Sequence, residues 1–353
     1  MKLEKFKIVF IIIPYHHIGG AERVHLNIIK SLKRKPIVFF DYSNTEQISK
    51  EFSENAYCFL LTDNKRKEFA FRFLQIISFF LPIVVFGCNS SFFLKIISKL
   101  KKRARLIDLT HAFSYPEKGM EIISLPYVDF INTRIVINNK TFEDYKNLYD
   151  LNNIDVSLLK RFRIIENGIK ISDFDQFKID SRFRNFTIGF VGRNSPEKRP
   201  ELFFKILESL DLRAKVIGDN FDNFKNDFPE VIYFENCNKP ESIREQFSEI
   251  SLLVITSSRE GFPLVIMEAM ELGIPVLSTN VGSIADHLIN DRNGYCVDSQ
   301  NDNEFLDFII DKIKDIVKDR ELYQKISLNA RQYACENFDI KIFEKKYQKL
   351  FYE

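Results

Sequence analysis

The chain has 353 residues, of which 45% are hydrophobic and 28% are charged, and its formal net charge at pH 7 is +2. This length exceeds one ordinary hydrophobic core, so two domains are expected, and the composition excludes a disordered chain. The small net charge gives no reason to expect nucleic acid as a partner. Residues 1–110, however, carry 19 lysines and arginines against 9 acidic residues, and such a local excess attracts acidic surfaces.

The five cysteines are scattered along the chain, and no two of them have the spacing of metal ligands. A disulfide framework is therefore not indicated, and a reducing cytoplasm fits. The apolar run Ile8–Ile13 is too short for the core of a signal peptide and ends at Pro14. We interpret it as the first strand.

The first half of the chain alternates short apolar runs with longer helical patterns, which predicts a parallel, doubly wound α/β sheet. Residues 69–86 approach the length of a membrane-spanning helix. Because Arg72 and Gln75 lie inside this segment and Pro82 divides it, a helix followed by a buried strand is favoured over a span. Strands are predicted at 8–13, 37–40, 83–86 and 106–110, and helices at 21–33, 69–80 and 92–102.

A second alternating set begins at residue 186 and predicts another α/β domain. Residues 175–183 are polar and show no period, so the domain boundary is expected there. The predicted domains are residues 1–178 and 179–337, followed by a final helical segment, 338–353. Strands are predicted at 186–191, 214–217, 231–234, 252–256 and 275–278, and helices at 200–210, 241–247, 264–272, 303–317, 321–336 and 340–351.

Glu260 and Glu268 lie on either side of a predicted strand-to-helix turn. In an open α/β sheet, ligands bind at the carboxyl ends of the strands, where a helix start offers its N–H groups to an anion. One carboxylate can therefore face a sugar and the other a ribose, with the intervening N–H groups on a diphosphate. Taken alone, the two glutamates also fit a solvated surface turn.

Further polar turns follow other predicted strands. Arg193 and Lys198 suit a diphosphate, because arginine offers a fork of donors and lysine a mobile charge. Gly19 and Gly20 stand between the first strand and its helix, where glycines let the backbone approach a ligand closely. A basic surface turn and a plain glycine turn are the alternatives. His111 ends the strand at 106–110 and fits either a structural or an active-site histidine.

The stretch from Glu260 to Pro275 closely resembles family 4 of the retaining GT-B glycosyltransferases, whose members usually read E-G-F-x-[LI]-x-x-x-E-A-M-A-x-G-x-P-V. Arg193 and Lys198 resemble the G-R-x-x-x-x-K-[GR] pattern of that family, and residues 19–23 match its G-G-A-E-R segment. These matches occur in the order that the family requires. Together they are far more specific than any one of them.

The resemblance covers nearly the whole chain and implies a GT-B architecture, with two Rossmann-like domains facing across a cleft. The first domain is expected to bind the acceptor, the second to bind the nucleotide sugar, and the last helix to cross back onto the first. The implied reaction is the retaining transfer of a hexose from a nucleotide-diphosphate sugar, with UDP-sugars favoured and GDP-mannose next. The implied acceptor is a glycan or a lipid-linked molecule in cell-surface polysaccharide synthesis, for example of lipopolysaccharide.

The resemblance also assigns roles to single residues. Glu268 is expected to bind the donor ribose and Glu260 the sugar hydroxyls, and His111 is expected near the donor sugar. Arg193 and Lys198 are expected to hold the diphosphate and to stabilise its negative charge as the glycosidic bond breaks. No protein nucleophile, metal or other cofactor is expected. Backbone contacts to the donor are expected from Gly19, Gly20, Gly261, Phe262, Pro263 and Leu264.

Some segments depart from the family or fit another one. Lys170 replaces the aspartate of its N-G-[VI]-D segment, and Ser283 and Asp286 replace a glycine and a glutamate of its G-G-x-x-E segment. Residues 173–175 read D-x-D, the metal motif of the other large glycosyltransferase fold. Because they lie in a polar linker and not after a strand, we interpret them as a chance match.

Residues Ser91–Arg105 combine apolar side chains with six lysines and arginines. This mixture suits an anionic bilayer surface, and a core-facing helix with a solvated basic end fits equally well. The basic excess of residues 1–110 favours membrane contact. The expected location is therefore the cytoplasm, peripheral on the cytoplasmic face of the inner membrane.

Two other functions stay open at this point. A nucleotide-sugar epimerase of the same fold uses a similar cleft, although it lacks the Arg-plus-Lys and E-x7-E pairing. A non-catalytic homologue that binds a glycan or a protein partner is the second alternative. Slow hydrolysis of a nucleotide sugar without acceptor separates an enzyme from a binding module.

Overall fold

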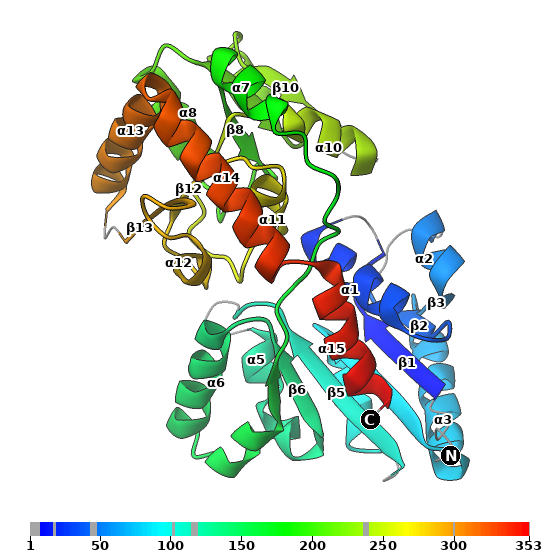
Figure 1. Cartoon of the computed structure of the whole chain (residues 1–353). Helices are drawn as coiled ribbons and strands as arrows, with labels where there is room; N and C mark the ends of the chain where they lie inside the picture. Colours follow the sequence, from blue (N-terminus) through cyan, green and yellow to red (C-terminus); the bar gives the residue numbers. More distant parts are fainter. Residues whose placement is uncertain are drawn as a thin grey trace. The chain divides into compact units, whose positions relative to one another are not determined.

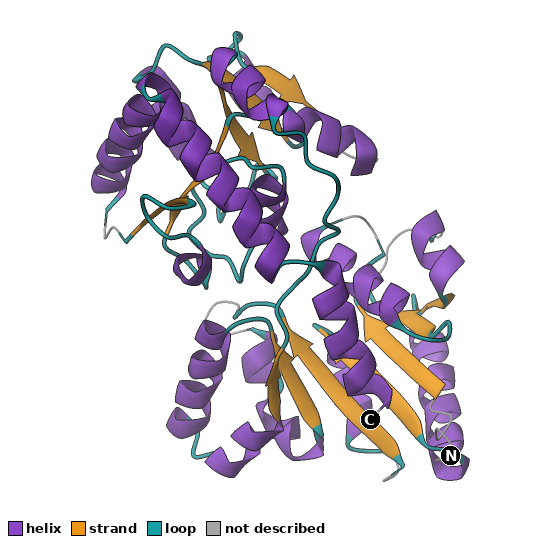
Figure 2. Ribbon diagram, viewed as in Figure 1, coloured by secondary structure: helices purple, strands orange, loops and turns teal. Residues whose placement is uncertain are grey.

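The computed structural model describes residues 8–16, 19–42, 48–100, 103–113, 119–235, 240–298 and 301–352. The chain forms two compact units, residues 1–167 with 341–353 and residues 168–340. In each unit the strands form one sheet and the helices lie outside it (Figure 2). These two parallel sheets confirm the predicted α/β fold class.

The first unit is built on a seven-stranded parallel sheet in the order β3-β2-β1-β4-β5-β6-β7 (Figure 1). The four strands predicted here are all present, because their apolar runs are buried in the middle of the sheet. β3, β6 and β7 have no predicted counterpart. β3 is an edge strand with alternate side chains exposed, β6 includes the buried Arg134, and β7 has only three residues. The strands are β1 (Ile8–Ile13), β2 (Ile37–Phe40), β3 (Tyr57–Leu60), β4 (Ile83–Cys88), β5 (Ala104–Thr110), β6 (Thr133–Val136) and β7 (Phe162–Ile164).

Most helices of the first unit lie between these strands in the chain. α3 begins before its predicted start at Phe69, because Asp63 caps it by accepting a hydrogen bond from the Arg66 N–H. α4 ends at Ile97, short of the predicted end at Lys102, and its apolar side chains are buried in the core, so they do not form the membrane-contacting surface expected of the segment Ser91–Arg105. The helices are α1 (Gly20–Ser31), α2 (Lys50–Asn55), α3 (Asn64–Phe80), α4 (Ser91–Ile97), α5 (Met120–Ile123), α6 (Asn139–Leu151) and α15 (Ile340–Tyr352), with 3-10 helices η1 (Leu125–Phe130) and η2 (Val156–Arg161).

The segment 69–86, weighed above as a membrane span, divides into α3 and β4 as predicted. Leu81 ends the helix and Pro82 separates it from the strand. No helix in the described part of the chain combines the length and the apolar character needed to cross a bilayer.

The last helix, α15, belongs to the first unit although it follows the second unit in the chain (Figure 1). The Leu350 carbonyl accepts a hydrogen bond of 2.7 Å from the Arg105 guanidinium. The rings of Phe351 and Phe86 lie 5.8 Å apart between centroids. Sequence-distant residues thus hold α15 against the first sheet.

The second unit is built on a six-stranded parallel sheet in the order β10-β9-β8-β11-β12-β13. All five strands predicted here are present within a residue or two of their expected bounds, and β13 is additional. The strands are β8 (Thr187–Val191), β9 (Arg213–Ile217), β10 (Ile232–Phe234), β11 (Leu252–Ile255), β12 (Val276–Thr279) and β13 (Gly294–Val297), and the helices are α7 (Phe177–Arg184), α8 (Pro200–Glu208), α9 (Asp222–Lys225), α10 (Pro240–Ser248), α11 (Leu264–Glu271), α12 (Ile284–His287), α13 (Asp302–Lys318) and α14 (Arg320–Asn337).

The boundary between the units lies at Asn167, not in the stretch 175–183. Both the main-chain N–H and the hydroxyl of Ser172 donate to Glu271 Oε1, at 3.0 and 2.7 Å, which fixes this segment to the second unit. The stretch itself forms most of α7, which buries Ile179. Its pattern looked irregular because α7 buries a charged residue, Arg182, whose guanidinium donates to the Leu272 carbonyl at 2.9 Å.

Candidate functional site

The candidate donor site lies where the strand order of the second sheet reverses direction. β8 is the first strand of this unit, β9 and β10 follow on one side, and β11 lies on the other. Loops that leave the carboxyl ends of two such neighbouring strands diverge and form a ligand crevice. Lys198 follows β8 and Glu260 follows β11.

The structure brings these two predicted residues together. The Lys198 ammonium forms a short ion pair with Glu260 Oε1, and both side chains are largely buried, at 21% and 12% exposure. The Ser257 hydroxyl donates to the same carboxylate oxygen at 2.8 Å. A positive and a negative group thus share the crevice, each able to meet one part of a charged, hydroxyl-bearing ligand.

The backbone around Lys198 is held by residues that the sequence patterns did not indicate. The Thr256 hydroxyl contacts the carbonyls of Lys198 and Arg199, at 2.7 and 2.9 Å. Arg199 has a left-handed conformation (φ +46°), and its side chain donates to the Thr256 carbonyl at 2.7 Å and to Asp302 at 2.6 Å. A left-handed residue other than glycine costs conformational energy, and these contacts offset that cost while they orient Lys198.

The loop that carries Glu260 and Gly261 is supported by a turn from the next strand. Gly282 has φ +63°, and a Cβ there would overlap the carbonyl oxygens of Glu260 and Gly261, so only glycine allows this approach. Both the N–H and the hydroxyl of Ser283 donate to the Gly261 carbonyl, at 2.9 and 3.1 Å. Ser283, which departs from the family pattern, therefore supports the predicted donor loop from behind.

The remaining predicted donor residues of this unit surround the start of α11. Phe262 is buried, and its ring stacks 4.2 Å from that of His287 between centroids. Pro263 is the N-cap of α11, and Leu264 is its first residue. Glu268 lies about one turn into the helix at a partly exposed position. The two glutamates thus flank a helix N-terminus.

Arg193 occupies the loop after β8 but is not gathered with the other predicted residues. Its side chain is 80% exposed, and it forms an ion pair of 3.2 Å with Glu197. To reach a bound diphosphate, this long side chain must leave Glu197. The structure therefore leaves its predicted role as an expectation.

A second buried charge in this unit, Glu271, has a structural role. Its carboxylate is 1% exposed and accepts hydrogen bonds from Arg244 at 2.6 Å and Arg331 at 2.8 Å. Burial alone would raise the pKa of Glu271, but the hydrogen bonds from Arg244 and Ser172 hold it below its usual value. Glu271 lies at the end of α11 and ties this helix to neighbouring segments.

In the first unit, the strand order reverses between β1 and β4. Gly19 precedes α1 as its N-cap, and Gly20 is the first residue of that helix. His111 directly follows β5, as predicted. All three lie at the carboxyl edge of the first sheet, the edge at which ligands bind in this architecture.

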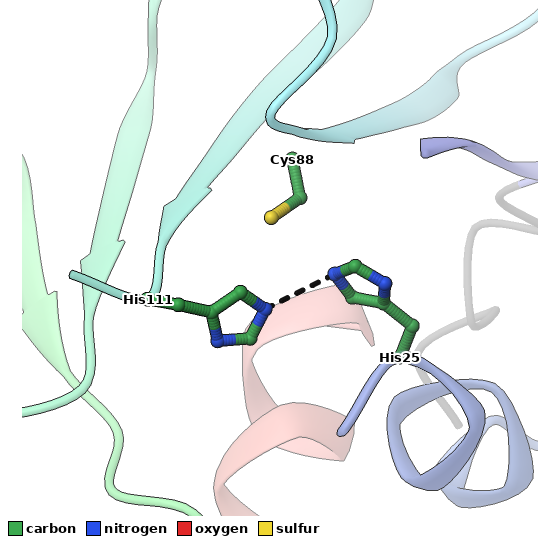
Figure 3. Close-up of side chains that lie close together, drawn as sticks. All are labelled: His25, Cys88 and His111. Atoms are coloured by element: carbon green, nitrogen blue, oxygen red, sulfur yellow. Dashed lines mark hydrogen bonds between the residues drawn. The ribbon is translucent and has the colours of Figure 1, made fainter. Parts of the chain in front are cut away.

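His111 has a partner that the sequence gave no signal for. Its Nε2 lies 3.1 Å from Nε2 of His25, a buried residue of α1, and Cys88 at the end of β4 lies beside the pair (Figure 3). Burial lowers the pKa of His111 to about 4. Burial and the proximity of His111 lower the pKa of His25 well below its usual value. Near neutral pH both rings are therefore uncharged, and one donates to the other.

Within the described part of the chain, His25, Cys88 and His111 form the cluster that could hold a metal ion, since their ligand atoms lie within 4.8 Å of one another. Two imidazoles and a thiol match the ligand preferences of Zn²⁺. A ligating histidine, however, normally donates its second ring N–H to a carboxylate or carbonyl. The buried Nδ1 of His25 has no such partner. The geometry therefore fits a histidine pair better than a metal centre.

Comparison with known proteins identifies a family match over the segment that holds these residues. Residues 172–333, which contain Lys198, Glu260 and Glu268, match the family described as glycosyl transferases group 1. The chain is 29% identical over 206 residues to the capsular polysaccharide biosynthesis glycosyltransferase CapM of Staphylococcus aureus, covering 52% of each chain. It is 25% identical over 160 residues to N-acetyl-alpha-D-glucosaminyl L-malate synthase of Bacillus anthracis, covering 43% of this chain and 40% of that one. The matches span about half the length of these relatives or less.

Solved structures resemble the chain over nearly its whole length. HepE of Anabaena, in a complex with UDP, has a TM-score of 0.75 at 16% identity, with 97% of this chain and 99% of that chain covered. The lipopolysaccharide outer core galactosyltransferase WaaB has a TM-score of 0.71 at 19% identity, with 98% of both chains covered. At these identities the likeness establishes the fold, and the sequence match to the glycosyl transferases group 1 family covers residues 172–333. The chain therefore has the GT-B fold and carries the domain of the glycosyl transferases group 1 family.

Proposed function

We propose that this protein is a retaining glycosyltransferase of family 4 that transfers a sugar from a nucleotide-diphosphate sugar to a glycan or lipid-linked acceptor. The observation that carries the proposal is the Lys198–Glu260 ion pair at the strand-order reversal of the second sheet. A donor needs a cation for its diphosphate and a carboxylate for its sugar hydroxyls, and this pair supplies both.

The donor engages the two charges separately. Its diphosphate attracts the ammonium of Lys198, and its sugar hydroxyls donate to Glu260, which keeps its hydrogen bond from Ser257. Glu268 binds the ribose from its position one turn into α11. Arg193, which is largely exposed, turns from Glu197 to the phosphates. Gly261, Phe262, Pro263 and Leu264 place the start of α11 against the same anion.

The transfer step needs no protein nucleophile. The acceptor hydroxyl oxygen forms a bond to the anomeric carbon on the face from which the diphosphate leaves, and the bond from that carbon to the phosphate oxygen breaks. The acceptor proton passes to a phosphate oxygen of the leaving group. Negative charge grows on the diphosphate as its bond breaks, so Lys198 and Arg193 interact more strongly with the transition state than with the donor.

His111 contributes as a neutral ring. Because burial lowers its pKa to about 4, the imidazole is uncharged near neutral pH, and the hydrogen bond between its Nε2 and Nε2 of His25 holds the ring in place. Such a ring donates to or accepts from a sugar hydroxyl without adding charge. Gly19 and Gly20 lie at the same edge of the first sheet.

The donor and the cellular role are proposed from the relatives. UDP-sugars are favoured, since HepE was solved with UDP and with UDP-glucose, and GDP-mannose is next, since one relative is a GDP-mannose-dependent alpha-mannosyltransferase. The relatives CapM and WaaB support a place in capsular or lipopolysaccharide synthesis. We place the enzyme at the cytoplasmic face of the inner membrane, where lipid-linked acceptors are found, and propose that it needs no metal.

A thermal-shift panel of UDP-, GDP-, ADP- and dTDP-sugars tests the donor site directly. A ligand that binds only the folded protein raises its melting temperature. We expect one base to give the largest shift and Lys198→Ala to abolish it. No shift with any nucleotide sugar contradicts the proposed donor site.

Two further variants separate the roles of the glutamates. Glu268→Ala is expected to weaken donor binding, because it removes the ribose contact, whereas Glu260→Ala is expected mainly to lower turnover. Radiolabelled sugar transfer to membrane extracts measures turnover, and the thermal shift measures binding. Wild-type values for both variants contradict the residue assignments.

A further inference from the structure

One buried polar side chain of α1 reaches out of its helix. His25 is 2% exposed, whereas Ser31, the other buried polar residue of α1, donates to the Ile28 carbonyl within the same helix. The remaining buried residues of α1 are apolar, namely Val24, Leu26, Ile28 and Ile29. An apolar residue would therefore suit the position of His25 in this packing.

Burial of the His25 imidazole is unfavourable by itself. Its Nδ1 is enclosed, and no group in the described part of the chain forms a hydrogen bond with it. A buried polar atom without a partner costs free energy, because it has lost its hydrogen bond to water. Leucine at this position would avoid that cost, so local stability does not explain the histidine.

The other ring nitrogen of His25 contacts His111. The two Nε2 atoms lie 3.1 Å apart, and the ring centroids lie 5.1 Å apart with their planes inclined by 49° (Figure 3). The rings therefore meet at these two nitrogens and do not stack. Since His25 lies on α1 and His111 follows β5, the bond ties the His111 ring to a helix that is packed in the core through its apolar residues.

This contact determines which atom of His111 is left for a ligand. His111 is partly exposed at the carboxyl edge of the first sheet, and its second ring nitrogen, Nδ1, lies on the side away from His25 (Figure 3). The χ2 torsion of a histidine is broad, so a ring without a partner samples more than one orientation. With Nε2 held by His25, a substrate hydroxyl meets Nδ1 alone.

Cys88 does not compete for this bond. It is the last residue of β4, its side chain is fully buried, and it lies beside the two rings (Figure 3). Burial raises the pKa of its thiol well above the usual value, so the sulfur is uncharged. Because a neutral thiol is a weak hydrogen-bond partner, the contact between the two imidazoles is the one that orients His111.

We propose that His25 is a positioning residue, which holds the His111 ring so that its Nδ1 faces a hydroxyl of the substrate. His25 itself is buried and touches no substrate. This inference rests on the function proposed above, in which His111 meets a sugar hydroxyl. An oriented side chain improves the geometry of the reacting complex more than its affinity, and small misplacements lower the rate strongly. Loss of His25 should therefore lower kcat and leave KM for the donor nearly unchanged.

Two substitutions at His25 test the proposal through the steady-state kinetics of sugar transfer. His25→Leu should lower kcat about tenfold or more, because a misplaced group can cost about 100-fold, and it should change the melting temperature by less than about 4 °C. Stability is preserved because the variant also removes the unpartnered Nδ1, and the partly exposed His111 can turn its freed nitrogen to water. His25→Gln should recover most of the lost kcat, because its amide group reaches the place of Nε2 and forms the same kind of hydrogen bond.

A matched control perturbs α1 without touching the histidine pair. Ile28 is fully buried in the same helix, and Ile28→Val should lower the melting temperature slightly but leave kcat unchanged. Wild-type kcat in His25→Leu, or an equal loss of kcat in Ile28→Val, overturns the proposal. Equal losses of kcat and of melting temperature in both His25 variants also overturn it, because they assign His25 to packing alone.

NMR of the full chain labelled with ¹⁵N-histidine gives a second readout that needs no sugar transfer. His25→Leu should shift the Nε2 resonance of His111, because that atom loses its hydrogen-bond partner, and His111→Gln identifies the resonance. An unshifted resonance overturns the proposal whatever the kinetics. The expected NMR shift in a wild-type chain that transfers no sugar contradicts the proposed transferase function instead.

Discussion

The Lys198–Glu260 ion pair should contribute to stability as a coupled unit before any donor binds. Both side chains are largely buried, at 21% and 12% exposure, so the pair lies between two known cases. Exposed pairs contribute about 0–1 kcal/mol, and removing one partner of a fully buried pair costs about 3–5 kcal/mol. For this partly solvated pair, we expect Lys198→Met to lower the free energy of unfolding by about 2 kcal/mol.

A double-mutant cycle isolates the interaction. Glu260→Gln keeps an acceptor for the Ser257 hydroxyl and removes only the charge. We expect the double variant to be destabilised less than the sum of the single variants, with a coupling energy of about 1–2 kcal/mol. Urea titration followed by circular dichroism gives the four free energies. The four free energies are compared only if all four variants show the same dependence of unfolding free energy on urea concentration. This condition is needed because the chain has two compact units, which need not unfold in one step.

The reasoning fails if the two substitutions are additive within about 0.5 kcal/mol, the limit seen for independent sites. Nucleotide sugar then provides a second check. Because its diphosphate attracts Lys198 away from Glu260, the coupling energy should fall at saturating donor. A coupling energy that stays constant would mean that the donor binds without engaging this pair.

Four other predictions follow from the described contacts. Gly282→Ala should lower the free energy of unfolding by about 1–3 kcal/mol, since φ is +63° and the new Cβ overlaps the Glu260 carbonyl oxygen. Urea titration measures this loss of stability, and the nucleotide-sugar thermal shift should also be lost. Wild-type stability and a wild-type thermal shift would contradict the described turn. Glu271→Gln should cost about 3 kcal/mol by the same titration, because it leaves two arginines without their shared carboxylate, and a neutral effect would mean that solvent replaces the carboxylate. The free energy of unfolding should fall as pH decreases from about 6.5 to about 4, because His111 binds a proton in the unfolded chain over this range but stays neutral in the folded chain, where burial lowers its pKa to about 4. His111→Gln should flatten this part of the pH profile. An unaltered slope would assign the pH dependence to other groups. Treatment with EDTA should leave sugar transfer unchanged, and added Zn²⁺ should raise the melting temperature of the wild type no more than that of His25→Gln; a larger rise in the wild type would identify a metal centre.

The local patterns were sufficient to predict most strands that are buried on two faces, but not β6, whose buried residues include the charged Arg134. A continuous apolar run such as Leu252–Ile255 has few alternatives to a central parallel strand. The same reasoning missed β3, whose alternate residues are exposed, and α7, whose buried face includes Arg182. In both cases the pattern of apolar residues is not the pattern of burial.

The sequence by itself determined the fold class, the family segment and the residues from which the donor site is proposed. These depend on residue identity at fixed spacing, as in Glu260 and Glu268 around one turn, and such short-range geometry follows from the helix and strand periods. Only the tertiary structure decided that Lys198 pairs with Glu260, that His25 meets His111, and that the exposed apolar surface lies on α3 and not on α4. Each of these facts joins segments distant in the chain, or depends on which helix face a sheet covers. The physical reason is that burial is a property of the packed unit, and two helices of similar composition differ in exposure once one of them is enclosed by the core.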